Sequence, residues 1–183
     1  SYNLNLLREI QLINQKFIAQ KESNVYPFIT INSGRPHAYC EAVSQMIGNS
    51  NFFMFENGAG ISKIDKDGYK YILDERIDNN LLAEMDILIE NVFTKFKEGF
   101  YYKQPNKQFA KTILFKENDS LIVKIWKFIE EEIMEKKLNL YCDHGYNFIN
   151  INIKGIHKGT GLEMFQNQTN IAYSEMVGVG DSL

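Results

Sequence analysis

One stretch of sequence decides the fold, and it covers residues 25–60. It opens with Val25-Tyr26-Pro27-Phe28-Ile29-Thr30-Ile31, an apolar and β-branched segment that predicts a strand buried on both faces of a parallel sheet. The tight turn Asn32-Ser33-Gly34-Arg35-Pro36 follows, and residues 38–47 predict a helix that Gly48 ends. Residues 51–55 predict a second buried strand, closed by Glu56-Asn57-Gly58-Ala59-Gly60. Strand, helix and strand in this order indicate an α/β fold.

The segments on either side extend this pattern. Apolar residues at helical spacing predict a helix over 4–21, ahead of the first strand. After residue 60, a hairpin over 61–73 leads into helices over 80–100 and 119–137 that alternate with strands over 109–115, 138–142 and 146–153. These strands predict an antiparallel sheet with helices on one face. A helix over 158–170 and a strand over 176–179 return to the first pattern.

The predicted architecture is therefore a Rossmann-like, parallel-sheet α/β core that is interrupted by an inserted α+β domain. We expect residues 1–60 to form the first part of the core, residues 61–154 the insert, and residues 155–183 the second part of the core.

Composition excludes several classes of protein. The 183 residues carry a formal net charge of −3, so no basic field indicates a nucleic-acid partner, and we interpret the aromatic run at 100–102 as packing. No apolar run approaches the ~20 residues that cross a membrane. The two cysteines, Cys40 and Cys142, provide neither a disulfide framework nor metal-ligand spacing. We expect a cytoplasmic protein with no nucleic-acid or membrane partner; its oligomeric state stays open.

Polar, glycine-containing turns follow three predicted strands: Ser33-Gly34-Arg35, Glu56-Asn57-Gly58 and Gly180-Asp181-Ser182. In open α/β sheets, ligands bind beyond the carboxyl ends of the strands. A hydroxyl and glycine before a helix offer donors to an anion, and a carboxylate at a strand end suits Mg²⁺. Lys158 could bring positive charge to the same anion. Each residue also fits a structural role: Ser33 as a helix cap, Arg35 as an ion-pair partner, Lys158 as a solvated lysine and Asp181 as a loop residue.

The order of these motifs resembles the haloacid dehalogenase-like (HAD) phosphohydrolases, and most closely their Cof-type, sugar-phosphatase-like subgroup. That subgroup has a large cap domain inserted after the third core strand. The resemblance rests on Ser33-Gly34-Arg35-Pro36, Glu56-Asn57-Gly58-Ala59, His157-Lys158-Gly159 and Gly178-Val179-Gly180-Asp181-Ser182, in this order along nearly the whole chain.

The resemblance implies a role for each matched residue. Ser33 would hydrogen-bond the phosphoryl group, Lys158 would neutralise its charge, and Asp181 would hold Mg²⁺. Gly34, Arg35 and Asn57 would lie around the bound phosphate. The implied activity is Mg²⁺-dependent hydrolysis of a small phosphorylated metabolite, such as a sugar phosphate or a phosphoglycerate derivative, through an aspartyl-phosphate intermediate. The insert would close over the site as a lid, and Lys107, Gln108 and Lys111 are candidates to face the cleft.

Two parts of the family pattern have no match. The first motif, Asp-x-Asp-Gly-Thr/Asn, supplies the family's nucleophile, and the fourth motif continues to a further Asp; neither is found here. We therefore expect these 183 residues to be a piece of a longer protein and to hydrolyse no phosphate ester by themselves. Two other interpretations stay open: a catalytically inactive relative that binds a phosphorylated ligand or a protein, and a phosphomutase of the same fold.

Overall fold

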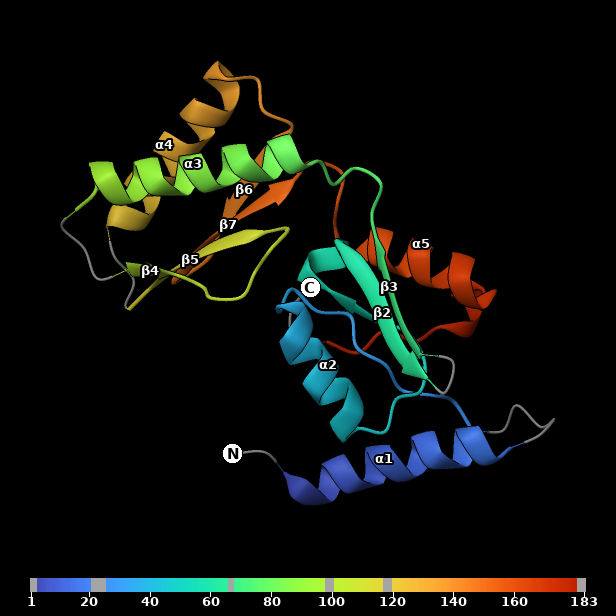
Figure 1. The fold of residues 1–183 in the computed structure, drawn as a ribbon. Helices are drawn as coiled ribbons and strands as arrows, with labels where there is room; N and C mark the ends of the chain where they lie inside the picture. Colours follow the sequence, from blue (N-terminus) through green and yellow to red (C-terminus); the bar gives the residue numbers. More distant parts are fainter. Residues whose placement is uncertain (1–2, 21–25, 66–67, 98–100, 117–119, 181–183) are drawn as a thin grey trace.

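The computed structural model describes residues 3–20, 26–65, 68–97, 101–116 and 120–180, and it confirms an α/β fold with two sheets. The chain forms two lobes, each built around one sheet (Figure 1). Within the described ranges, no helix is long and apolar enough to cross a membrane.

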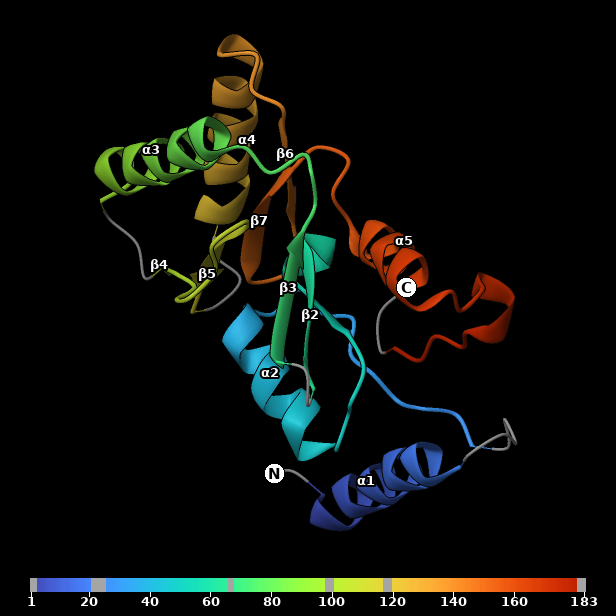
Figure 2. The same ribbon diagram turned by 45° about the vertical axis from the view of Figure 1, so that its right-hand side comes forward.

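The first lobe contains a three-stranded antiparallel sheet in the order β1-β2-β3. Its strands are β1 (Phe53–Phe55), β2 (Gly60–Asp65) and β3 (Gly68–Leu73). The predicted hairpin thus forms, and it extends the sheet of this lobe. The helices α2 (His37–Met46) and α5 (Lys158–Thr169) lie on opposite sides of the sheet (Figure 2).

Helix α1 (Leu4–Ala19) is fastened to this lobe by one buried amide. The Asn14 side chain donates from Nδ2 to the carbonyls of Ile29 (3.1 Å) and Ile47 (2.8 Å), and its Oδ1 accepts from the Ile29 N–H (2.7 Å). A buried polar side chain is tolerated only when its hydrogen bonds are made, so Asn14 fixes how α1 meets the segment before Ser33.

The predicted strand over 25–31 is wrong in its extent. Val25 lies outside the described residues, and residues 26–31 form no strand. One parallel bridge joins Asn32 to Met54, with the Met54 N–H donating to the Ile31 carbonyl (2.8 Å) and the Ser33 N–H donating to the Met54 carbonyl (3.2 Å). The segment therefore runs beside β1, but it pairs with it too briefly to make a ladder.

The predicted strand over 176–179 is also wrong. These residues have no regular structure, and Val177 and Val179 are 90% and 97% exposed. A strand is stable only where a neighbouring strand satisfies its backbone N–H and C=O groups, and within the described residues no strand lies beside this segment.

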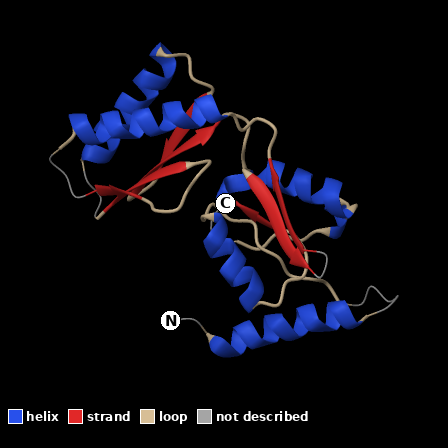
Figure 3. Cartoon of the chain, viewed as in Figure 1, coloured by secondary structure: helices blue, strands red, loops and turns tan. Residues whose placement is uncertain are grey.

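The second lobe contains a four-stranded antiparallel sheet in the order β4-β5-β7-β6. Helices α3 and α4 cover one face of it (Figure 3), as the alternation of helices and strands predicts. The short edge strand β4 was not predicted, because its aromatic residues were interpreted as packing contacts. The elements are α3 (Asn79–Lys95), β4 (Tyr101–Lys103), β5 (Lys111–Phe115), α4 (Leu121–Glu135), β6 (Leu140–His144) and β7 (Phe148–Ile153).

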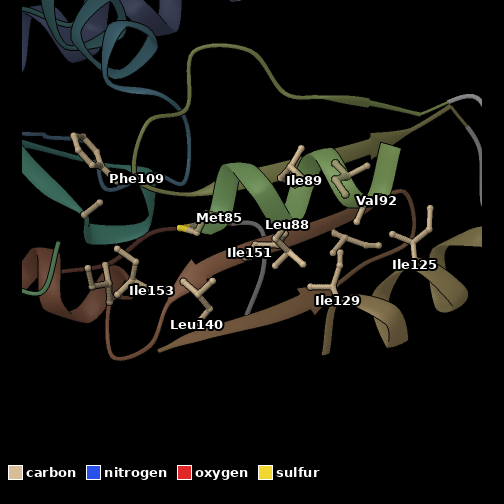
Figure 4. Packing of buried hydrophobic residues seen from close by; sticks show 14 of the residues in the cluster. Met85, Leu88, Ile89, Val92, Phe109, Ile125, Ile129, Leu140, Ile151 and Ile153 are labelled. Atoms are coloured by element: carbon tan, nitrogen blue, oxygen red, sulfur yellow. The ribbon is translucent and has the colours of Figure 1, made fainter. Parts of the chain in front are cut away.

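A continuous buried cluster joins the cores of the two lobes. In the second lobe, apolar side chains of α3 and α4 pack on those of the sheet (Figure 4). Phe109, in the loop between β4 and β5, packs with its ring centroid 6.4 Å from that of Phe55 in β1. The loop that carries Phe109 therefore contacts the first lobe at the carboxyl end of β1.

The chain passes between the lobes at two places, and Arg76 joins them. Its Nε donates to Oδ1 of Asp74 (2.7 Å), one terminal nitrogen donates to Oδ2 of Asp74 (2.6 Å), and the other donates to the Gly155 carbonyl (2.8 Å). Asp74 and Arg76 follow β3, and Gly155 follows β7. Burial raises the pKa of Asp74, but the hydrogen bonds and charge of Arg76 outweigh it and leave that pKa below its ordinary value.

Arg76→Ala is expected to lower the free energy of unfolding by about 1–2 kcal/mol at pH 7, because it leaves a buried carboxylate without its main partner. Asp74 has a lowered pKa in the folded protein, so its pairing stabilises the fold above its ordinary pKa. The difference between Arg76→Ala and the native protein should therefore shrink as the pH falls through the lowered pKa. Urea unfolding across this pH range measures it, with exposed Arg8→Ala as the control. An equal loss at all pH values would contradict the assignment.

Candidate functional site

The turn after residue 32 and the turn after β1 are joined backbone to backbone. The Asn57 N–H donates to the Ser33 carbonyl (3.1 Å), and the Glu56 N–H donates to the Arg35 carbonyl (3.0 Å). The Ser33 hydroxyl accepts from the Arg35 N–H (3.2 Å) within its own turn. Ser33, Arg35 and Asn57 therefore lie together beyond the carboxyl end of β1, where the sequence predicts a binding site.

Tight packing holds these two turns in shape. Asn57 has a φ of 60° and Gly58 a φ of 91°, both in the left-handed region that favours glycine and asparagine. A Cβ atom on Gly34 would stand 2.5 Å from Oδ1 of Asn57, so a larger residue at position 34 would require the Asn57 side chain to move. The positions of Gly34 and Asn57 thus depend on each other.

The amino-terminal end of α5 packs against the two turns. The Asn32 side chain donates from Nδ2 to the Lys158 carbonyl (3.0 Å), and a Cβ on Gly58 would stand 2.2 Å from the His157 carbonyl oxygen. Lys158 is exposed and is the first residue of the helix, whose amino-terminal end carries partial positive charge. The structure thus brings the backbone of Lys158 next to the two turns that carry Ser33, Gly34, Arg35 and Asn57.

Asp181, the predicted Mg²⁺ ligand, lies outside the described residues. Among those described, no group of three or more His, Cys, Asp or Glu side chains could hold a metal ion. The letters Asp65-Lys66-Asp67-Gly68 match the start of the family's first motif, but they join β2 to β3. Because β2 runs antiparallel to β1 with Phe53 opposite Ser62, Asp65 lies beyond the amino end of β1, on the side away from Ser33 and Asn57.

Glu56 is the residue that the sequence analysis missed. It was interpreted only as part of a turn, yet it is 1% exposed. Its carboxylate accepts from the N–H groups of Gln108 (3.0 Å to each oxygen), Phe109 (2.7 Å) and Ala110 (3.0 Å), all in the loop between β4 and β5. A carboxylate placed between a buried strand and an Asn-Gly turn was the available signal.

A network of polar side chains extends from the first lobe over the face of the second sheet that α3 and α4 do not cover. Asn57 Nδ2 donates to Asn152 Oδ1 (3.2 Å), and Asn152 lies 3.5 Å from Asp143. Asp143 accepts from Asn150 (2.9 Å), which accepts from the Thr112 hydroxyl (2.8 Å). The side chains of the network are Asn57, Thr112, Asp143, Asn150 and Asn152, and we call them the polar network.

The side chains of Lys107 and Lys111 point to opposite faces of the second sheet. Lys107 is 8% exposed and donates from Nζ to Thr112 Oγ1 (2.7 Å), so it joins the polar network. Lys111 is also buried, but its Nζ pairs with Asp86 of α3 (2.8 Å), on the helix-covered face. Neighbouring residues of a strand point to opposite faces, which explains why Lys111 and Thr112 separate. Of the three residues predicted to face the cleft, Lys107 lies on the face of the polar network, and Gln108 donates its backbone N–H to Glu56. Lys111 points to the opposite face, so the prediction for Lys111 is wrong.

Burial is the main cause of the pKa shifts of Glu56 and of Lys107. It raises the pKa of Glu56, which the three backbone N–H groups and Lys107 oppose without cancelling. It lowers the pKa of Lys107, where Glu56 and Asp143 oppose the shift and Arg35 adds to it. Arg35, Glu56 and Asp143 therefore each lie close enough to Lys107 to influence its pKa, and Arg35 and Glu56 do so from the other lobe.

Comparison with known proteins gives the same family as the motifs. The model of a family described as haloacid dehalogenase-like hydrolase matches residues 7–183. A search of curated proteins found no significant match.

Solved structures show the same fold at low sequence identity. A sucrose-phosphatase from Synechocystis, solved with sucrose and phosphate, has a TM-score of 0.61 at 13% identity over 96% of this chain and 68% of its own. A trehalose-6-phosphate phosphatase domain from C. albicans has a TM-score of 0.59 at 16% identity, over 92% of this chain and 57% of its own. The IMP-nucleotidase from Plasmodium falciparum has 0.56 at 10%, over 96% and 54%. This chain thus spans about half to two thirds of these proteins, and with residues 7–183 matching the family model it belongs to the haloacid dehalogenase-like hydrolases.

Proposed function

We propose that the protein is a phosphatase that hydrolyses a small phosphorylated metabolite, such as a sugar phosphate or a phosphoglycerate derivative. The observation that carries this proposal is the convergence of three segments: the Ser33 turn, the Asn57 turn and the first turn of α5 with Lys158. Hydroxyl and backbone donors beside a lysine at a helix start form a suitable place for a phosphoryl group. The three similar structures named above are a sucrose-phosphatase, a trehalose-6-phosphate phosphatase and a nucleotidase, which agrees with this chemistry.

Each residue of the site has a stated task in this proposal. The Ser33 hydroxyl donates to a phosphoryl oxygen, and Lys158 compensates the negative charge that accumulates there during transfer. Gly34 permits the close approach of the backbone, while Arg35 and Asn57 border the bound phosphate. Asp181 would hold Mg²⁺, which would supply further positive charge to the phosphoryl oxygens. The attacking carboxylate would come from a segment outside these 183 residues, because Asp65-Lys66-Asp67-Gly68 matches only the start of the first motif and Asp65 lies beyond the end of β1 that is away from Ser33.

We also propose where the cap begins and ends. The hairpin β2–β3 pairs with β1, so it belongs to the core sheet, and the joined connections at Asp74 to Arg76 and at Gly155 lie between the sheets. This placement moves the first boundary from residue 60 to about residue 75 and keeps the second near residue 155. A cytoplasmic location and the lack of nucleic-acid partners stay predictions from composition.

The test is phosphate release by the full-length protein from a panel of hexose phosphates, phosphoglycerate and phosphoglycolate, with Mg²⁺ and with a chelator. Mg²⁺-dependent release from at least one ester is expected. Well-folded protein that releases no phosphate would overturn the proposal and favour a binding module. Transfer of phosphate between two positions of one sugar, without release, would identify a phosphomutase instead.

A further inference from the structure

The proposed phosphatase chemistry gives no task to Glu56, although this is the most deeply buried carboxylate that the structure describes. Burying a carboxylate is costly unless its hydrogen bonds are made. Here the N–H groups that donate to the Glu56 carboxylate lie more than 50 residues away in the sequence, in the loop between β4 and β5. The cost is therefore offset by a contact between the two lobes.

The contact is well suited to fix a loop. Three successive backbone N–H groups, from Gln108 to Ala110, converge on one carboxylate at 2.7–3.0 Å. Phe109 at the centre of the loop also packs on Phe55, the residue before Glu56. A charged acceptor with several donors holds a backbone more firmly than a neutral pair does.

The fixed loop carries Lys107 next to these three residues. The Lys107 ammonium contacts Thr112, and Arg35 and Asp143 lie near enough to influence it electrostatically. The polar network connects this position to Asn57, whose side chain touches the Ser33-Gly34 turn. Lys107 therefore lies on the side of the second lobe that faces the phosphate-site turns.

We propose that Glu56 is a positioning residue: it clamps the backbone of 108–110 to the first lobe and thereby holds Lys107 where it binds the leaving group of the substrate. This inference rests on the proposed function. It assigns Lys107 to an electron-rich oxygen of the leaving group, a hydroxyl or carboxylate, and it separates binding of that group from binding of the phosphoryl group at Ser33 and Lys158.

The test compares Glu56→Gln, Lys107→Met and the double variant with the native full-length protein. In Glu56→Gln an NH2 group replaces one carboxylate oxygen, and this group can only donate, so it cannot pair with the loop N–H groups. Exposed Glu90→Gln, on α3, is the matched control. Turnover is measured on the best ester of the panel and on acetyl phosphate, whose leaving group, acetate, is smaller than that of any ester in the panel. Hydrogen exchange of the amides of 108–110 is followed in parallel.

Glu56→Gln is expected to raise KM for the larger ester by about ten- to a hundredfold and to leave acetyl phosphate hydrolysis nearly unchanged. Lys107→Met should reproduce this selectivity while keeping the 108–110 amides protected. The double variant should be no worse than Lys107→Met, because Glu56 acts through Lys107. A merely structural role would instead lower the turnover of both substrates by one factor.

Equal losses on both substrates, additive losses in the double variant, or unchanged exchange at 108–110 in Glu56→Gln would each overturn the inference. If the native protein hydrolyses neither substrate, the proposed phosphatase function fails, and with it the role of Lys107. Faster exchange in Glu56→Gln would then still support the clamp between the lobes, and unchanged exchange would overturn the clamp as well.

Discussion

Replacing Lys158 with methionine is expected to lower kcat of the full-length protein on its best phosphate ester by about 100- to 1000-fold. Lys158 begins α5, where the helix end already favours an anion, and its backbone carbonyl is bound by Asn32 one residue before Ser33. The side-chain charge can therefore be removed while the backbone of the site stays anchored. Methionine keeps most of the length of the side chain, so the loss reports on charge.

The measurement is a steady-state phosphate-release assay, with thermal unfolding of each variant as a check on folding. Lys124→Met is the control, because Lys124 is exposed on α4 in the second lobe. The control should retain full activity. A Lys158→Met protein that is folded and equally active would show that Lys158 is only a solvated lysine at a helix start, which is the structural alternative for this residue.

Gly58→Ala is expected to lower the free energy of unfolding by about 2–5 kcal/mol. The backbone of Gly58 has a φ of 91°, which costs an alanine about 1–2 kcal/mol. In addition, the new Cβ would stand 2.2 Å from the His157 carbonyl oxygen and 2.8 Å from the Gly161 nitrogen, and overpacking adds about 1–3 kcal/mol. Both atoms are backbone atoms, so no side chain can turn away to relieve the contact.

Gly68→Ala separates the two costs. Gly68 also has a positive φ, of 115°, but a Cβ there would meet no atom within 4 Å. Urea unfolding of both variants should show only the backbone cost at Gly68 and the larger sum at Gly58. Equal destabilisation would contradict the close packing of α5 against the Asn57 turn, and with it the grouping of Lys158 with Ser33.

Local sequence patterns predicted most elements because those elements depend on local chemistry. Helix α5 and the β2–β3 hairpin follow from apolar spacing and an Asp-Gly turn, and they form close to the expected residues. The strands over 25–31 and 176–179 failed for the opposite reason. Their composition suits a strand, but a strand also requires a neighbour that pairs with it along several residues, and a sequence window does not contain that neighbour.

The same difference between local patterns and contacts distant in sequence applies to the candidate site. The turns at Ser33, at Asn57 and before Lys158 could be predicted from local residue types: glycines, a hydroxyl and the start of a helix. The order of these motifs along the chain indicated that they belong to one site. Glu56 could not, because its meaning depends on three amides more than 50 residues away. Likewise, the opposite directions of Lys107 and Lys111 depend on where β5 begins, which the prediction placed two residues early.

The double connection between the lobes restricts how the cap can move. A single covalent connection would let one lobe twist freely about the bond axis. Here two segments run between the lobes, and Arg76 fastens one to the other through Asp74 and the Gly155 carbonyl. Two fastened points define a line, so the available rotation is a bend about the line from Asp74 to Gly155, and torsion is resisted. The contact of Glu56 with the backbone of residues 108–110 lies apart from this line and resists the bend as well, so Lys107 keeps one position relative to Ser33 while this contact holds.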